Sequence, residues 1–411
     1  MTNRVVITGV GIQSPLGIGL GPLMEGLYLG KSSIKNIESW DGLGLRAPIA
    51  SAIDHVDEKS IPRKARRSMS RISFLSVKAG EEALATSGLD QSLIQNRRTG
   101  VAFASTMGGT SALEHFFKKQ MESKSVGAGV ESTTFLKIMS HTAAANVALY
   151  FGIPGRVISS NVACTASTQS IGLGYEAIKY GMMDRMLCGG AEELHIAIAR
   201  VFDVLGATAN KFQSPEEACR PFSFDRCGIV VGEGAGAFML ENYDQAVARG
   251  AKIYGEILGF NTNCDSMHMT NPSTSGIEDC MMGALEDAGI SAEEVQYVNA
   301  HGTGTPQGDI AESQGIHKVF GEVSVSSLKG HFGHQMGAAG VIETAACLGM
   351  IMDQKLVPTR NLVQPADDCA PLDYLMHETR DSRVKIIAKN SFAFGGINST
   401  LILTGGHRDE S

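Results

Sequence analysis

The eight cysteines form no C-x-x-C pair, the composition is not basic, and no long apolar run interrupts the chain. Without paired cysteines, a zinc ribbon or a dithiol redox motif is not expected. The low cysteine density is typical of a reducing compartment, so we expect a cytoplasmic protein whose thiols mostly act as small buried hydrophobes. A net charge of −8 argues against general nucleic-acid binding. A spanning helix needs about 18 or more apolar residues, and none is expected here.

The remaining composition is that of a folded protein. The chain has 411 residues, of which 43% are hydrophobic and 19% are charged, which predicts two or three lobes around a large core. Its 48 glycines follow no fixed period and mark tight loops. The segment MTNRVVITGVGIQSPLG is broken by glycine and lacks a cleavage-like site, so it is expected to be a first strand and not a signal peptide.

Short β-branched runs that end near glycine alternate with helical stretches, which predicts an α/β fold. The runs occur in a similar order twice, which indicates a diverged duplication with halves 1–250 and 251–411. Larger insertions at 105–150 and 191–231 are candidates for capping or dimer-forming elements. The predicted strands are 4–8, 100–104, 156–163, 185–188 and 235–240 in the first half, and 253–259, 295–300, 322–328, 384–389 and 399–404 in the second.

Cys164 is the candidate nucleophile. It lies in NVACTASTQS, where a strand is expected to turn into a helix that continues through the apolar positions Ile171, Tyr175, Ile178 and Met182. The free N–H groups and positive dipole end of such a helix lower the pKa of a thiol and stabilise a developing oxyanion. For an isolated cysteine, a buried structural role would be the default explanation.

Two further segments carry histidines. His301 lies at a strand end in NAHGTGTPQGD, whose Thr303 and Thr305 offer hydroxyls to a polar extended ligand. Lys329, His331 and His334 precede a helix predicted over 335–353, the position that mirrors Cys164 in the duplication. The alternative for His301 is a ring that satisfies loop carbonyls. The i, i+3 spacing of His331 and His334 lacks a third ligand, so no metal site is expected.

A cysteine with two or three histidines on strand-end loops suits acyl transfer. The thiolate attacks a thioester, and neutral imidazoles that carry a hydrogen donate to a thioester oxygen as it becomes an enolate after loss of CO2. No metal is needed for this chemistry.

These segments resemble the elongating β-ketoacyl-[acyl-carrier-protein] synthases of the thiolase-like superfamily, over essentially the whole chain. The resemblance implies a five-layered α-β-α-β-α fold, a dimer, and a ping-pong decarboxylative Claisen condensation with malonyl-acyl carrier protein. It implies no prosthetic group, since the phosphopantetheine arm of the carrier protein brings the substrates. The matching segments are VITGVGIQSPLG, NVACTAS, CGGAEE, VGEGAG, AHGTGTPQGD, KGHFGHQMGAAGVIE and NSFAFGG.

The resemblance also assigns roles to single residues. Cys164 is implied as the acylated nucleophile, with His301 and His334 as the decarboxylation pair and Lys329 orienting that region. The backbone N–H groups of Cys164 and Phe394 are the implied oxyanion hole, and Phe394 is the implied gate; His331 has no catalytic role. The remaining assignments are Glu343 and Asp309 for structural support, Thr303, Thr305, Met107, Phe202, Ile229 and Thr270 for substrate binding, and Arg63, Lys64 and Arg67 for carrier-protein docking.

The docking assignment falls in the basic run IPRKARRSMSR at 61–71, which otherwise would be a solvated helix face. Attraction between this run and an acidic carrier protein would depend strongly on salt.

Some positions depart from the family pattern. Ala393 and Ile397 replace the usual Gly and Thr of the gate loop, and a Cβ at Ala393 is expected to restrict its motion. Ser223 and Cys227 stand at usual Asp positions, and Ile229 replaces a common Phe, which would widen the pocket. These departures favour, as the alternative function, a specialised ketosynthase for polyenes or polyketides, homodimeric or paired with a catalytically silent homologue. A non-catalytic chain-length partner and a cysteine hydrolase fit the filled catalytic positions less well.

Overall fold

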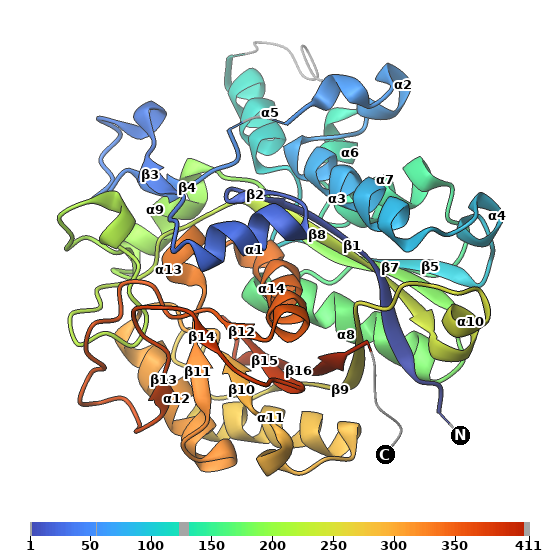
Figure 1. Ribbon diagram of the computed structural model, residues 1–411. Coiled ribbons are helices and arrows are strands. Elements are labelled where there is room, and N and C mark those ends of the chain that lie inside the picture. The colour runs from blue at the N-terminus through green and yellow to red at the C-terminus, as the bar shows by residue number, and fades with distance from the viewer. Residues whose placement is uncertain (1, 55, 123–130, 407–411) are drawn as a thin grey trace.

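The computed structural model describes residues 2–54, 56–122 and 131–406, and the described part is built on one long mixed sheet (Figure 1). The insertion expected at 105–150 therefore lies partly outside the described residues. From the centre outward, the first half of the sheet contains β1 (Val5–Ser14), β8 (Gly234–Asn242), β7 (Arg185–Glu192), β5 (Thr99–Ala104) and β6 (Val157–Ile158). The second half contains β9 (Gly255–Cys264), β16 (Ile397–Gly405), β15 (Ile386–Ala393), β10 (Tyr297–Asn299) and β11 (Ser324–Ser326).

The two halves repeat one topology. In each, the first two steps from the centre are antiparallel up to β7 or β15, and the next two are parallel. They join where β1 and β9 pair over three residues. Short strands complete the edges and loops: β2 (Gly17–Ile18), β3 (Ile34–Asn36), β4 (Ile49–Ser51), β12 (Lys355–Leu356), β13 (Asp373–Tyr374) and β14 (Arg380–Asp381).

Helices form three layers around the two half-sheets. In the middle, α8 (Ala166–Lys179) and α14 (Ala339–Asp353) pack against each other and against strands of both halves. The outer layers are α3 (Arg71–Ser87) with α7 (Thr142–Phe151), and α11 (Thr274–Ala288) with α12 (Pro306–Phe320). Figure 1 shows α8 and α14 between these pairs. The layers are those of the thiolase-like fold that the sequence predicted.

The alternation of side chains along the strands explains the layers. On β7, Leu187 packs in the outer core with α3, whereas Cys188 packs in the central core with α8. On β15, Ala388 packs outward with α11, and Ile387 packs inward with α14. Both faces of each half-sheet are therefore apolar, as expected for strands covered by helices on both sides.

Apart from Glu343, Thr344 and the terminal Asp353, the middle helix α14 consists of apolar residues and glycines, because it is enclosed between the two half-sheets. Among the described residues, the stretch Met336–Asp353 is the one helical segment long and apolar enough to cross a membrane, with a mean hydropathy of 1.3. The sequence analysis expected no such segment. However, 89% of this stretch is buried inside the protein, as in the core helix of a folded domain.

Ten predicted strands are present, although several boundaries differ. The strand predicted over 156–163 is reduced to two residues, because β6 is an edge strand that pairs on one side only and the chain then turns toward Cys164. The predictions over 295–300 and 322–328 shrink to three residues each. The remaining helices lie in loops and insertions: α1 (Leu20–Tyr28), α2 (Arg63–Arg66), α4 (Gln91–Ile94), α5 (Thr110–Glu122), α6 (Thr134–Ile138), α9 (Ile196–Val204), α10 (Tyr243–Ala248) and α13 (Lys329–Phe332).

Candidate active site

Cys164 lies in a single 3-10 turn, Ala163–Thr165, that leads directly into α8. The turn begins at Ala163 with φ 47°, a left-handed conformation that costs a residue with a Cβ some strain. The helix α14 begins in the same way, with the 3-10 turn Met336–Ala338 and φ 45° at Met336. The segment that follows His334 thus has the mirrored geometry that the duplication predicted.

The structure brings one thiol and two imidazoles together. One ligand atom each from Cys164, His301 and His334 lie within 4.8 Å of one another, and all three residues are buried. His301 follows β10, and His334 follows α13 and precedes the turn into α14. The two rings meet edge to face, with 5.0 Å between their centroids and an angle of 81°. Three segments that are far apart in the sequence therefore converge at one point.

Both imidazoles are held neutral. Burial lowers the pKa of His301 and of His334 well below 6.5, and the positive charges of Lys329 and Lys389 lower both values further. The backbone N–H of Met336 donates to Nδ1 of His334 at 3.3 Å, so the hydrogen of the neutral ring is on Nε2. This Nε2 is buried and has no hydrogen-bond partner in the described chain. It is a free donor beside the thiol, as stabilisation of an enolate oxygen requires.

The pKa of the thiol differs from the sequence-based expectation. Burial raises the pKa of Cys164 to about 12, and the positive charge of Lys329 only partly opposes this effect. The prediction of a depressed pKa at the helix start is therefore wrong for this structure, because desolvation outweighs the favourable dipole. The thiol has to give up its proton during attack, and the imidazole nitrogens are the basic atoms within reach.

A buried ion pair and buried hydrogen bonds hold the backbone at His301 and in the loop that follows it. Lys329 Nζ donates to Glu343 Oε1 and to the carbonyl oxygen of His301, each at 2.5 Å. Asp309 accepts hydrogen bonds from the backbone N–H groups of Thr303 and Gly304, both at 3.1 Å, and burial raises its pKa to about 6. Lys329 is thus paired with Glu343, and Asp309 binds the backbone of the Thr303 loop, whereas their supporting roles in the reaction stay predictions.

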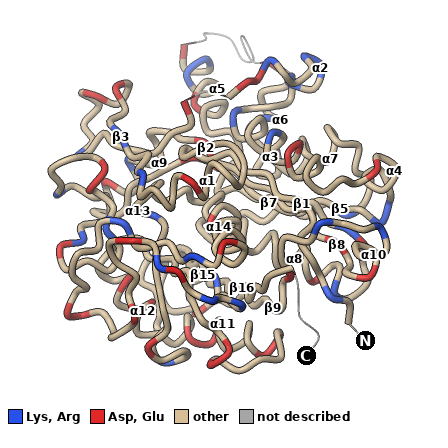
Figure 2. The backbone as a smooth tube through the Cα atoms, in the orientation of Figure 1, with Lys and Arg blue, Asp and Glu red and all other residues tan. Residues whose placement is uncertain are grey.

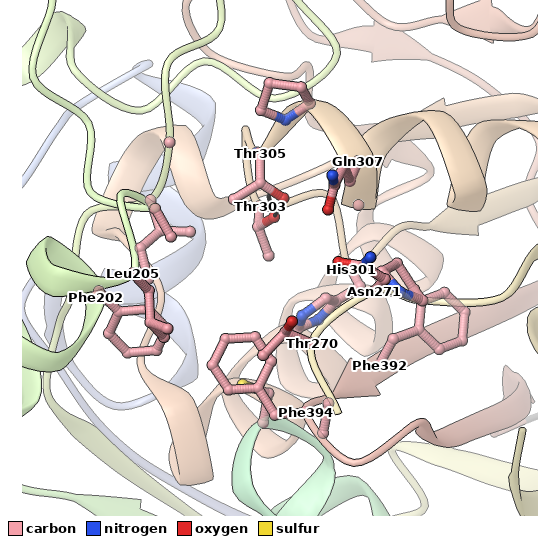
Figure 3. A pocket seen from close by; sticks show the side chains of 18 of the residues that line it. Phe202, Leu205, Thr270, Asn271, His301, Thr303, Thr305, Gln307, Phe392 and Phe394 are labelled. Atoms are coloured by element: carbon pink, nitrogen blue, oxygen red, sulfur yellow. Dashed lines mark hydrogen bonds between the residues drawn. The ribbon is translucent and has the colours of Figure 1, made fainter. Parts of the chain in front are cut away.

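A cavity of about 460 Å³ opens onto these groups (Figure 3). One side carries the hydroxyls of Thr303 and Thr305, which lie 2.9 Å apart, and the other carries the rings of Phe202 and Phe394, whose centroids are 5.7 Å apart. Phe394 is 37% exposed. The cavity therefore combines an apolar side with polar contacts. Nine predicted residues line it: Cys164, Phe202, Ile229, Thr270, His301, Thr303, Thr305, His334 and Phe394.

Some predicted residues lie elsewhere. Met107 does not line this cavity; its side chain is 42% exposed, because it lies in the bend between β5 and α5 and points out of this chain. Of the basic run, Arg63, Lys64 and Arg67 are exposed at α2, where the backbone tube in Figure 2 carries the colour of Lys and Arg. Arg71 is not part of this surface, since it pairs with the buried Glu233 at 2.8 Å.

The residues that depart from the family pattern lie in the gate loop, in the cavity lining and in a buried turn. Ala393 ends β15 in register with Ile397, in ordinary extended backbone, so its Cβ causes no strain. The left-handed positions of the gate loop are Gly395 and Gly396. The restricted motion expected at Ala393 stays a prediction. Ile229 and Cys227 line the cavity, whereas Ser223 is buried and donates to Asp225.

Three buried charged residues beside the site were not predicted from the sequence. Glu312 accepts hydrogen bonds from the backbone N–H groups of His301 and Gly302, and Glu192 accepts one from Gly337. Burial raises the pKa of each carboxyl to about 7. The third residue is Lys389 on β15, which is fully buried. A charged residue inside an apolar strand, as in IIAKNSF, is the signal that could have pointed to it.

The thiol and the two imidazoles are also ligand types for zinc, and 4.8 Å is close enough for three donors to share an ion. The ammonium groups of Lys329 and Lys389 oppose this, since the positive potential that keeps the imidazoles neutral also disfavours a divalent cation.

Two half-sheets of repeated topology, with a buried thiol and two neutral imidazoles where they meet, define a thiolase-like condensing enzyme. Family models for the β-ketoacyl synthase N-terminal and C-terminal domains match residues 2–246 and 254–363. The chain belongs to the β-ketoacyl synthase family. It is a β-ketoacyl-[acyl-carrier-protein] synthase, an acyltransferase that forms a carbon–carbon bond by decarboxylative Claisen condensation.

Known relatives resemble the chain over nearly its full length. The 3-oxoacyl-[acyl-carrier-protein] synthase 2 of Vibrio cholerae serotype O1 is 36% identical over 412 residues, which cover 97% of this chain and 98% of that protein. A β-ketoacyl synthase from Burkholderia phymatum STM815 has a TM-score of 0.94 and 40% identity, covering 98% of this chain and 100% of that one. The ishigamide ketosynthase/chain length factor has a TM-score of 0.93 and 30% identity, covering 99% of this chain and 100% of that one.

Proposed function

We propose that Cys164 carries the acyl group in a ping-pong condensation. The observation that carries the proposal is the approach of the cysteine, His301 and His334 ligand atoms to within 4.8 Å at the cavity. The thiol attacks the thioester of acyl-acyl carrier protein and loses its proton to an imidazole nitrogen, and the carrier thiol leaves. The acyl group then remains on sulfur until malonyl-acyl carrier protein enters.

The two histidines act on the malonyl group. The free Nε2–H of His334 donates to the malonyl thioester oxygen, and His301 supports the same oxygen as CO2 leaves. The resulting enolate attacks the acyl carbonyl on Cys164, and the tetrahedral oxygen is held by the backbone N–H groups of Cys164 and Phe394. The product is a β-ketoacyl-acyl carrier protein, and the thiol is regenerated.

The cavity accommodates the phosphopantetheine arm of the carrier protein, and no prosthetic group takes part. Thr303, Thr305 and Thr270 offer hydroxyls to the amide groups of the arm, and Phe394 acts as the gate between the acyl and malonyl sides. The acidic carrier protein docks on the exposed cations Arg63, Lys64 and Arg67.

The central test is the mass of the protein after incubation with acyl-acyl carrier protein. Cys164→Ala abolishes the acyl adduct, whereas Cys280→Ala, which removes a buried thiol outside the cavity, retains it. His301→Ala and His334→Ala each retain one imidazole beside the thiol, so both still accept the acyl group, but they decarboxylate malonyl-acyl carrier protein about 10²-fold or more slowly. Chain elongation by the Cys164→Ala variant, or unchanged product formation by both histidine variants, would contradict the assignment.

A second candidate is a specialised ketosynthase for polyenes or polyketides, paired with a homologous, catalytically silent subunit. Ile229 lines the cavity where the family commonly has a larger ring, and the ishigamide relative is a ketosynthase paired with a chain length factor. Weighing the acyl group trapped on Cys164 from cell extract separates the two candidates. A saturated chain supports fatty-acid elongation, and a polyunsaturated or polyketone chain supports the alternative.

Three further proposals concern the whole protein. It works in the cytoplasm and as a dimer, with either a second copy or a homologue. Met107 is exposed in the single chain. A dimer partner would cover it, and Met107 would then line the acyl-binding pocket as the resemblance implied. The halves 1–250 and 251–411 are the products of the duplication, in line with their repeated strand order.

A further inference from the structure

Lys389 is a charged side chain buried in the middle of the protein, and the steps described above do not use it. Its side chain is 0% exposed. Its ammonium group lies 3.0 Å from Glu343 Oε2 and 3.3 Å from Thr168 Oγ1, and it also donates to the hydroxyl of Ser391. Burying an ammonium group costs free energy unless the group is paired, so a lysine at this position calls for a functional explanation.

Lys389 and its partners lie on the three elements that adjoin Cys164, His334 and Phe394. Thr168 lies on α8, one turn after Cys164. Glu343 lies on α14, the helix that begins after His334. Lys389 itself lies on β15, which ends one residue before Phe394. One ammonium group thus connects the nucleophile helix, the histidine helix and the gate strand.

Glu343 is shared between two lysines. Its Oε1 accepts from Lys329 at 2.5 Å, and its Oε2 faces Lys389 at 3.0 Å. Lys329 also donates to the carbonyl oxygen of His301 at 2.5 Å. A continuous row of contacts therefore runs from Lys389 through Glu343 and Lys329 to His301. Without Lys389, one oxygen of a fully buried carboxylate would have no cationic partner.

The histidines face charged groups from several elements, and two cations in this set share one anion, Glu343. The set contains Lys329 on α13, Lys389 on β15, Glu343 on α14, Glu312 on α12 and Glu192 on β7. Burial is the main cause of the lowered pKa of both His301 and His334, and the positive charges of Lys329 and Lys389 lower it further.

We propose that Lys389 is a positioning residue of the condensation reaction: its contact with Glu343, which in turn pairs with Lys329, fixes the backbone of His301, and it places a second ammonium group beside the two imidazoles. The inference rests on the proposed roles of Cys164, His301 and His334. It assigns a function to a residue that touches neither the acyl nor the malonyl group.

The test compares Lys389→Met with wild type, and uses Lys385→Met as the matched control, because Lys385 is exposed and directly precedes the same strand. In Lys389→Met, we expect kcat for condensation to fall at least about tenfold, because His301 loses its fixed position. KM for both carrier-protein substrates stays within about twofold, since the cavity lining is unchanged. Lys385→Met behaves as wild type.

The pH profile separates positioning from packing. Loss of a buried positive charge raises the imidazole pKa values, so the acidic limb of the kcat profile moves to higher pH in Lys389→Met than in Lys385→Met. A purely structural lysine would lower kcat at every pH and leave the limb in place, and that result overturns the proposal. Lys389→Gln, which keeps a donor but no charge, gives the same shift if Lys389→Met does not fold. Failure of both variants to fold overturns the proposal in favour of a structural role.

The acyl adduct on Cys164 is measured first in all variants. If wild type forms no adduct, the proposed function fails, whatever Lys389 does. If the adduct forms and the limb does not move, only the role of Lys389 fails. As a second check, Lys389→Met introduced into a Glu343→Gln background changes kcat by less than about twofold, because the contact through which it acts is already lost. A full additive loss there contradicts action through Glu343.

Discussion

Replacing Glu343 by Gln should destabilise the protein far more than a single isosteric substitution usually does. The Glu343 carboxylate and both of its ammonium partners, Lys329 and Lys389, have side chains that are 0% exposed. An amide of the same shape offers one acceptor oxygen, and its NH2 group points hydrogens at an ammonium group that has only donors. Two buried positive charges then remain without an anion between them.

The expected cost is about 3–5 kcal/mol of the free energy of unfolding, the usual effect of removing one partner from a buried ion pair. Since domains are stable by about 5–15 kcal/mol, this is a large fraction of the total. The assay is urea denaturation of wild type and variant under conditions where refolding is reversible.

The matched control is Glu278→Gln, which breaks the Lys318–Glu278 pair at 3.2 Å, whose side chains are 55% and 35% exposed. It should cost at most about 1 kcal/mol, since solvent already screens this pair. If Glu343→Gln also lies within about 1 kcal/mol of wild type, the carboxylate does not bear the charge that holds the two lysines, and the reasoning is refuted.

Other predictions concern the reaction. Because burial keeps the pKa of His301 and His334 well below 6.5, malonyl decarboxylation should fall less than about twofold from pH 7 to pH 6; two ordinary imidazoles would lose their neutral forms about tenfold, and such a loss contradicts the assignment. Ile229→Phe narrows the cavity and should lower kcat/KM for long acyl chains about tenfold relative to short ones in a competition assay; equal losses would show that this side chain does not select chain length. Arg67→Glu should raise KM for acyl carrier protein and weaken its salt dependence; an unchanged KM would place docking elsewhere.

The sequence pattern predicted the α/β class and all ten strands, because period-2 and period-3.6 patterns reflect which face of an element is buried; the layered architecture was implied by the resemblance alone. The sequence predicted strand lengths and surface patches less well, because contacts with residues distant in sequence determine both. The strand expected at 156–163 forms only at Val157–Ile158, since an edge strand has one partner. The basic run at 61–71 does not form one surface, because Arg71 turns inward to Glu233.

The motifs were sufficient to determine the family and the reacting residue types, since a thiol at a helix start and histidines at strand ends are local features. Tertiary structure alone decided the rest, because pKa and partnership depend on groups that are distant in sequence. It brought the Cys164, His301 and His334 ligand atoms within 4.8 Å, and burial raised the pKa of Cys164 to about 12 where a helix terminus alone would have lowered it. It also placed Lys389 against Glu343 across 46 positions of the chain, a contact that no local pattern encodes.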